Sequence, residues 1–105
     1  MPSDRLENLK NLVAQNPSDP FLLYGLAMEY RRLGELESAI EFFAELVARN
    51  PEYVPSYLQY GQALERAGKP DDAKAVYTNG IAAATRKGDQ HASSELRGAL
   101  DLLGL

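Results

Sequence analysis

The sequence predicts an all-α protein of about six helices that pair into stacked antiparallel hairpins. Apolar residues recur three and four positions apart along most of the chain, which is the spacing of one face of a helix. Much of residues 19–51 also returns 34 positions further on. No segment alternates apolar and polar residues over a useful length, so no sheet is expected. A repeat of this length is typical of a stacked array, in which each unit buries its apolar face on its neighbour.

The first two predicted helices have clear ends. Residues 4–15 carry one apolar stripe, and Pro17 stops this helix because proline disfavours the helical conformation of the residue before it. The second helix is predicted to open at Asp19, whose side chain can cap the free amides of the first turn. Pro20 follows at a position where proline is tolerated. Gly34 stands where a left-handed residue is needed to close the helix.

The remaining helices follow the same rules. Pro51 stops the third helix, Pro55 falls in the first turn of the fourth, and Gly68 closes the fourth. The predicted ranges of these four helices are 36–49, 53–67, 70–86 and 90–103.

Residues of the same kind occupy matching places in the repeat. At an offset of 34 the matched pairs are Asn16/Asn50, Pro17/Pro51, Arg32/Arg66, Gly34/Gly68, Ala39/Ala73 and Phe43/Tyr77. In this spacing the chain resembles the tetratricopeptide repeat (TPR) family, whose period is about 34 residues. The family's characteristic places are filled by Leu23, Leu26, Ala27, Tyr30, Ala39, Phe43 and Pro51 in the first unit, and by Tyr57, Tyr60, Gly61, Leu64, Ala73 and Tyr77 in the second. The resemblance implies a short right-handed superhelix, an α-α solenoid. Thr85 replaces the closing proline of the second unit, so that helix is expected to run on to about residue 86.

The repeat also predicts how one domain divides. The first helix overlays the third at the same offset, so it corresponds to the second helix of a unit whose first helix is missing. The last helix fits the first-helix pattern only after a shift of about two residues, and we interpret it as a diverged cap. The expected divisions of the single domain 1–105 are a leading half-repeat 4–17, repeats 20–53 and 54–87, and a capping helix 89–105.

The composition limits the class of function. The net charge of −4 argues against a nucleic-acid or anionic-membrane partner, since both favour a basic surface. The chain has no cysteine, which excludes disulfides and thiolate metal sites. No apolar run reaches the roughly 18–20 residues that span a bilayer, and residues 1–10 lack the pattern of a signal peptide. A cytoplasmic protein is therefore expected.

Catalysis has little support in the sequence. The only histidine, His91, lies on the weakly patterned last helix, and a catalytic site needs several converging groups. The acidic pairs Glu35/Glu37 and Asp71/Asp72 fall at helix starts, where they complement the helix dipole. We therefore expect no enzyme, no catalytic residue, no cofactor and no metal.

The expected functional surface is the concave inner face that the first helix of each unit presents in the resembled family. The partner-binding residues predicted on this face are Phe21, Tyr24, Met28, Arg31, Leu58, Gln59, Gln62 and Arg66. Phe21, Tyr24 and Met28 form one apolar line on a helix. Two interpretations of this line stay open: it binds a partner's extended segment or helix, or it is buried under the last helix.

Two functions follow from these interpretations. The first is an adaptor or scaffold whose groove binds a protein or peptide partner. The alternative is a structural homo-oligomerisation module, such as a homodimer, in which Phe42 either contacts the first helix or forms a self-association site. Binding of acidic tails through Lys and Asn, known for some relatives of the family, is not expected, because Tyr24, Met28 and Gln59 stand at the corresponding places.

Overall fold

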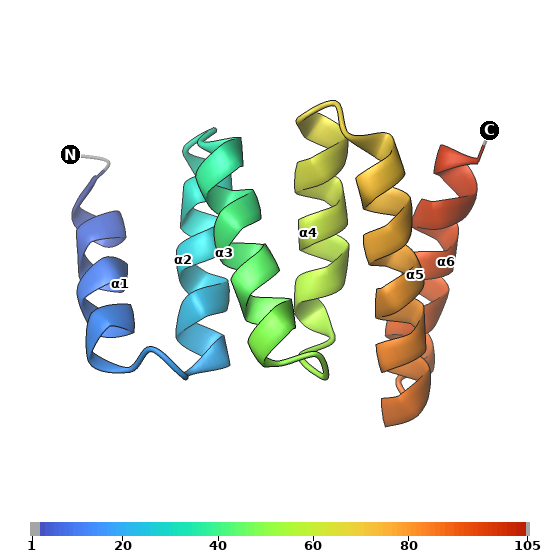
Figure 1. The fold of residues 1–105 in the computed structure, drawn as a ribbon, viewed down its shortest axis with the longest axis horizontal. Helices are drawn as coiled ribbons and strands as arrows, with labels where there is room; N and C mark the ends of the chain where they lie inside the picture. The colour runs from blue at the N-terminus through green and yellow to red at the C-terminus, as the bar shows by residue number, and fades with distance from the viewer. Residues whose placement is uncertain (1–2, 105) are drawn as a thin grey trace.

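The computed structural model describes residues 3–104, which form six α-helices and no strand (Figure 1). The helices are α1 (Ser3–Gln15), α2 (Pro20–Arg32), α3 (Leu36–Arg49), α4 (Pro55–Arg66), α5 (Pro70–Lys87) and α6 (Gln90–Leu103). The outer limits of the predicted domain, residues 1 and 105, lie outside this range. No helix in the described part is long and apolar enough to cross a membrane.

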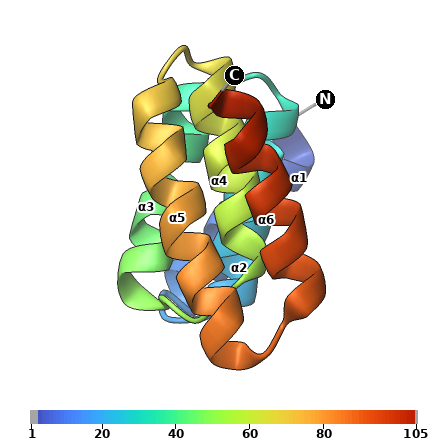
Figure 2. The same cartoon turned by 90° about the vertical axis from the view of Figure 1, so that its right-hand side faces the viewer.

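Successive helices run antiparallel and stack along the long axis of the molecule (Figure 1). Each helix packs on the next along the chain, and α4 also contacts both α2 and α6. Viewed along the stack, α3 and α5 lie on one side of α4, and α6 lies on the other (Figure 2). The even-numbered helices therefore form an inner row, as expected for an all-α solenoid of helix hairpins.

The ends of the helices follow their local chemistry. The Asp19 carboxylate accepts a hydrogen bond from the backbone N–H of Phe21 at 3.0 Å, which confirms the predicted cap of α2. Gly34 has a φ of +80°, and the next amide donates to the Tyr30 carbonyl at 2.9 Å, which closes the helix. The predicted start of α4 was wrong by two residues: the helix begins at Pro55, which needs no amide partner in the first turn.

Small residues let the paired helices approach closely. A Cβ built on Gly80 of α5 would lie 2.6 Å from the Cβ of Tyr57 on α4 and 3.1 Å from Leu96 Cδ1 on α6. A Cβ on Gly61 would overlap the fully buried ring of Tyr77. The hydroxyl of Tyr77 donates a hydrogen bond to Glu65. The helices therefore meet through glycine on one side and an aromatic ring on the other.

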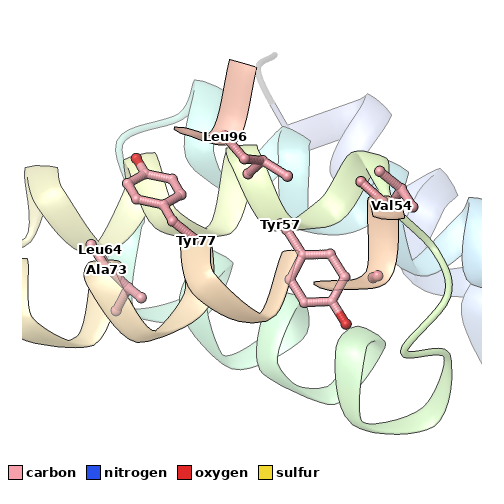
Figure 3. Packing of buried hydrophobic residues seen from close by; sticks show 8 residues of the cluster. Val54, Tyr57, Leu64, Ala73, Tyr77 and Leu96 are labelled. Atoms are coloured by element: carbon pink, nitrogen blue, oxygen red, sulfur yellow. The ribbon is translucent and has the colours of Figure 1, made fainter. Parts of the chain in front are cut away.

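The core consists of two buried clusters. The smaller one joins Ala27, Ala39 and Phe43 of the α2–α3 hairpin to Ala63 of α4. The larger one brings together Tyr57 from α4, Tyr77 from α5 and Leu96 from α6 (Figure 3). Leu96 is 1% exposed, so α6 is part of the core.

Phe42 packs on the neighbouring helix of its own hairpin. Its ring stacks on Tyr30 of α2, with the ring centroids 5.5 Å apart and the planes 7° from parallel. The ring is partly buried, and this stacking leaves both predictions for Phe42, a contact with the first helix or a self-association site, as predictions. Helix α1 reaches the Tyr30 ring through Lys10, whose Nζ lies 6.0 Å from the ring centre.

Candidate functional site

A cavity of about 650 Å³ opens on the inner face between α1 and α2. Phe21, Tyr24 and Met28, the predicted apolar line, contribute to its lining, and Leu9 of α1 lies opposite them. Phe21 is 70% exposed, whereas Tyr24 and Met28 are partly buried. An exposed phenylalanine beside an apolar cavity is a surface that gains free energy when something covers it.

The last helix does not cover this surface. In the described part of the chain, α6 packs on α5 and α4 and has no contact with α2. The interpretation that the line of Phe21, Tyr24 and Met28 is buried under the last helix is therefore wrong.

Tyr24 connects this cavity to a second one. The second cavity, of about 260 Å³, lies between α4 and α6 and is lined by Leu58 and Gln59 as well as Tyr24. The Tyr24 ring lies 6.4 Å from the ring of Phe43 and 5.7 Å from that of Tyr53, measured between centroids. Burial raises the pKa of Tyr24 above its ordinary value, with a smaller contribution from Tyr53. The side chain is therefore held by the core and forms a fixed floor where the two cavities meet.

Arginines surround the first cavity. Its lining includes four, Arg5, Arg31, Arg32 and Arg66, against one carboxylate, Glu29. Glu29 is 4% exposed and accepts a hydrogen bond from Arg32 Nε at 3.0 Å. This bond, assisted by the charges of Arg32 and Arg5, lowers the pKa of Glu29 below its ordinary value.

Two of the four arginines have few polar partners for their positive charge. Arg5 Nη1 is 3.9 Å from Glu29 and its side chain is 72% exposed. Arg66 forms no ion pair or side-chain hydrogen bond with any residue in the range 3–104. The first cavity is thus a local basic region in an acidic protein.

Arg31 connects two inner helices. Its guanidinium donates to the side-chain oxygens of Gln59 and Gln62 on α4, the second at 3.1 Å. These three residues were predicted to bind a partner, and their polar groups bind one another in this structure. Gln62 lines neither cavity. Their arrangement fixes α2 against α4 beside Tyr24.

The second cavity has the opposite charge. Asp89, His91 and Glu95 reach its lining from the start of α6. His91 is exposed and lies 3.5 Å from Glu95. In the described range, no group of three or more His, Cys, Asp or Glu side chains is placed to hold a metal ion. The arrangement offers apolar surface with charged margins, which suits binding more than acid–base chemistry.

Sequence reasoning missed the α1 wall of the first cavity. Arg5 and Leu9 are four residues apart on one face of α1, and only the inner helices were expected to form the site. The signal was present in the repeat: at the offset of 34, Leu9 corresponds to Phe43, which is completely buried between hairpins. A partly exposed residue at that place indicates an open face.

Comparisons with known proteins agree with this architecture. A family model described as tetratricopeptide repeat matches residues 30–100. The chain is 29% identical over 91 residues to a TPR repeat-containing protein of Pseudomonas aeruginosa, with 87% of each chain covered. It is 38% identical to a tetratricopeptide repeat domain protein from Salinibacter ruber, whose solution structure superposes with a TM-score of 0.79 over 84% of this chain and 89% of that one. PcrH, crystallised in complex with the chaperone-binding region of PopD, is similar in fold alone: the TM-score is 0.90 at 14% identity, covering 98% of this chain and 78% of PcrH.

Proposed function

The chain belongs to the tetratricopeptide repeat family, and from this premise we propose that it is a non-enzymatic protein–protein interaction module that holds a partner's segment on its inner face. Stacked helical repeats form extended concave surfaces of the kind that bind other proteins. The observation that carries the proposal is the exposed Phe21 at the open cavity beside Tyr24 and Met28.

The proposed surface has the properties of an interface centre. Covering an exposed phenylalanine contributes up to about 2–3 kcal/mol. Tyr24 is already fixed by Phe43 and Tyr53, so a partner loses little free energy in ordering it. The methionine thioether of Met28 adapts to different apolar side chains.

The other proposed contact residues divide into two groups. Leu58 offers apolar surface in the second cavity, and Arg66 offers a positive charge at the first. Arg31, Gln59 and Gln62 act mainly by holding α2 against α4, which positions the surface. The fold neighbour PcrH, seen in complex with a region of PopD, supports the proposal by analogy.

Selection from a phage-displayed random-peptide library tests the proposal. Binders are selected on the full chain and then measured against Phe21→Ala and against Leu102→Ala. Leu102 is a matched control because it is 73% exposed but lines neither cavity. We expect Phe21→Ala to weaken binding about tenfold or more and Leu102→Ala to leave it unchanged. Binders that are unaffected by Phe21→Ala, and whose amide chemical-shift changes fall on α3 and α5, would refute the proposal.

Homo-oligomerisation is a second candidate function. Leu102 on α6 and Leu12 on α1, which is 42% exposed, place large apolar side chains on the two terminal helices. Light scattering over a dilution series tests this function. It predicts that the average mass falls on dilution, and that in Leu102→Asp this fall begins at a higher protein concentration. A constant monomeric mass excludes it.

A further inference from the structure

The first cavity lies where the repeat lacks one helix. At the offset of 34 residues, α1 corresponds to α3 and α2 corresponds to α4. Helix α3 packs between α2 and α4, whereas α1 contacts α2 alone among the described helices. Among residues 3–104, no helix packs beside α1 in the way that α2 packs beside α3.

Exposed side chains on α1 confirm that this position is vacant. Leu12 is 42% exposed, while its counterpart Leu46 is completely buried. Leu9 is partly exposed, while its counterpart Phe43 is completely buried against the inner helices. The same kinds of residue are thus covered in one unit and open in the preceding half-unit.

The inner face of α2 is open at the same place. On α4, Gln59 and Gln62 face α2 and receive the hydrogen bonds of Arg31. Their counterparts on α2 are Gly25 and Met28, and both line the first cavity. The cavity therefore has the two walls, α1 and α2, between which an additional inner helix of the array would lie.

Charge distinguishes this vacancy from the equivalent place in the complete unit. The counterpart of Arg5 is Ala39, which is fully buried in one cluster with Ala27. A helix that enters the vacancy would therefore meet a cation where α2 meets a methyl group. Arg66 adds a second positive charge with no ion pair in the described range. The incoming helix needs an acidic residue at that crossing.

We propose that the first cavity receives an amphipathic α-helix of a partner protein, which completes the leading half-repeat and places an acidic side chain against Arg5. The inference rests on the proposed function and specifies the conformation and charge of the partner's segment. A second copy of this chain is a poor occupant. Its α6 is the inner helix at the end of the array. When α6 is aligned with the first-helix pattern, which requires a shift of about two residues, Arg97 takes the place of Ala27 and Gly61. Arg97 would then face Arg5, a like charge.

Synthetic peptides copied from α2 provide the probe. A fluorescent peptide of residues 19–33 contains the Asp19 cap and the apolar face that packs on α3, the counterpart of α1. One version carries Ala27→Glu and a matched version carries Ala27→Lys. A third combines Ala27→Glu with Gly25→Pro, which prevents a continuous helix. Fluorescence anisotropy with the full chain gives the affinities, and amide chemical shifts locate the site.

We expect the glutamate peptide to bind at least about fivefold more tightly than the lysine peptide. In the Arg5→Glu variant this preference reverses, whereas Arg97→Glu, which makes the same change of charge outside both cavities, leaves it unchanged. The proline peptide loses binding, and the shifts of α1 and α2 change together. Circular dichroism of each variant controls for folding.

Four outcomes overturn the inference. Equal affinity of the proline peptide shows an extended ligand, and equal affinity of the glutamate and lysine peptides removes the role of Arg5. Both outcomes leave the proposed function intact, because a peptide still binds on the inner face. Absence of binding by every α2 peptide refutes the helix model, while the library selection decides separately whether the inner face binds peptides. Self-association that broadens the signals of Leu9 and Phe21 identifies a second copy as the occupant and also overturns the proposal.

Discussion

Gly80→Ala gives a direct test of the close packing between α4, α5 and α6. The added methyl would lie 2.6 Å from Tyr57 Cβ and 2.9 Å from Tyr57 Cγ, and ordinary contact begins near 3.4 Å. The Cβ of Tyr57 is fixed to the backbone, so α4 and α5 must separate by about 0.8 Å to relieve the overlap. Such overpacking costs about 1–3 kcal/mol. Alanine is favoured over glycine inside a helix by about 1 kcal/mol, so this gain offsets part of the cost. The fixed position of Tyr57 Cβ puts the overpacking cost in the upper part of its range, so after this gain we expect a net loss of about 1–2 kcal/mol.

Gly98→Ala is the matched control for this substitution. Gly98 lies inside α6, and a Cβ there would have no atom within 4 Å. Helix propensity acts alone at this position, so we expect a gain of about 0.5–1 kcal/mol. The two variants should therefore differ by about 1.5–3 kcal/mol in urea denaturation followed by circular dichroism, and by roughly 6–24 °C in Tm. If Gly80→Ala equals or exceeds Gly98→Ala in stability, the packing argument fails.

Three further predictions concern polar side chains. Burial, and after it the hydrogen bond to Glu65, raises the pKa of Tyr77, so the unfolded chain loses this proton first as the pH rises. The free energy of unfolding should therefore fall above about pH 10. The urea midpoint should fall less in Tyr77→Phe than in the original chain, and an equal fall would contradict the assignment. Arg32 lowers the pKa of Glu29, so the ionised Glu29 contributes to stability above the unfolded pKa of 4.5, and this contribution is lost as the pH falls below it. Glu29→Gln should be less stable at neutral pH, and its stability should change less with pH in the acid range. An unchanged dependence on acid pH would contradict the assignment. Arg31→Met removes both hydrogen bonds to α4 and should lower the free energy of unfolding by about 1–2 kcal/mol in urea denaturation. In a chain where Gln59 and Gln62 are already methionine, Arg31→Met should cost much less. An equal cost in both chains would show that Arg31 is not coupled to the two glutamines.

The sequence predicted the helices well because their ends are determined locally. Proline, the Asp19 cap and the positive-φ glycines act within a few residues, and the offset of 34 fixed how the hairpins follow one another. The stacking of Phe42 on Tyr30 was not predicted, because Tyr30 lies on another helix and only the angle between the helices brings the two rings together.

The candidate site was predictable in its apolar part and in two of the arginines at the first cavity, Arg31 and Arg66. Helical spacing put Phe21, Tyr24 and Met28 on one line, and the structure places all three at the first cavity. The hydrogen bonds of Arg31 could not be foreseen, since they depend on the distance between two inner helices. The contrast in charge between the two cavities was predictable only in part. Arg31 and Arg66 lie on the inner helices, whereas Arg5 comes from α1 and the acidic side chains of the second cavity come from the start of α6.

The single packing neighbour of α1 has a consequence for motion. Helices α2 to α5 each contact at least two others, and α6 contacts α4 and α5, whereas α1 rests on α2 alone. Local opening costs least where the fewest apolar contacts are lost, so amide hydrogens in α1 should exchange faster than those in α3, its counterpart. The same helix forms one wall of the first cavity. Occupation of the cavity would therefore be recorded by slower hydrogen exchange in α1, even for a ligand too weak to alter the overall melting of the chain.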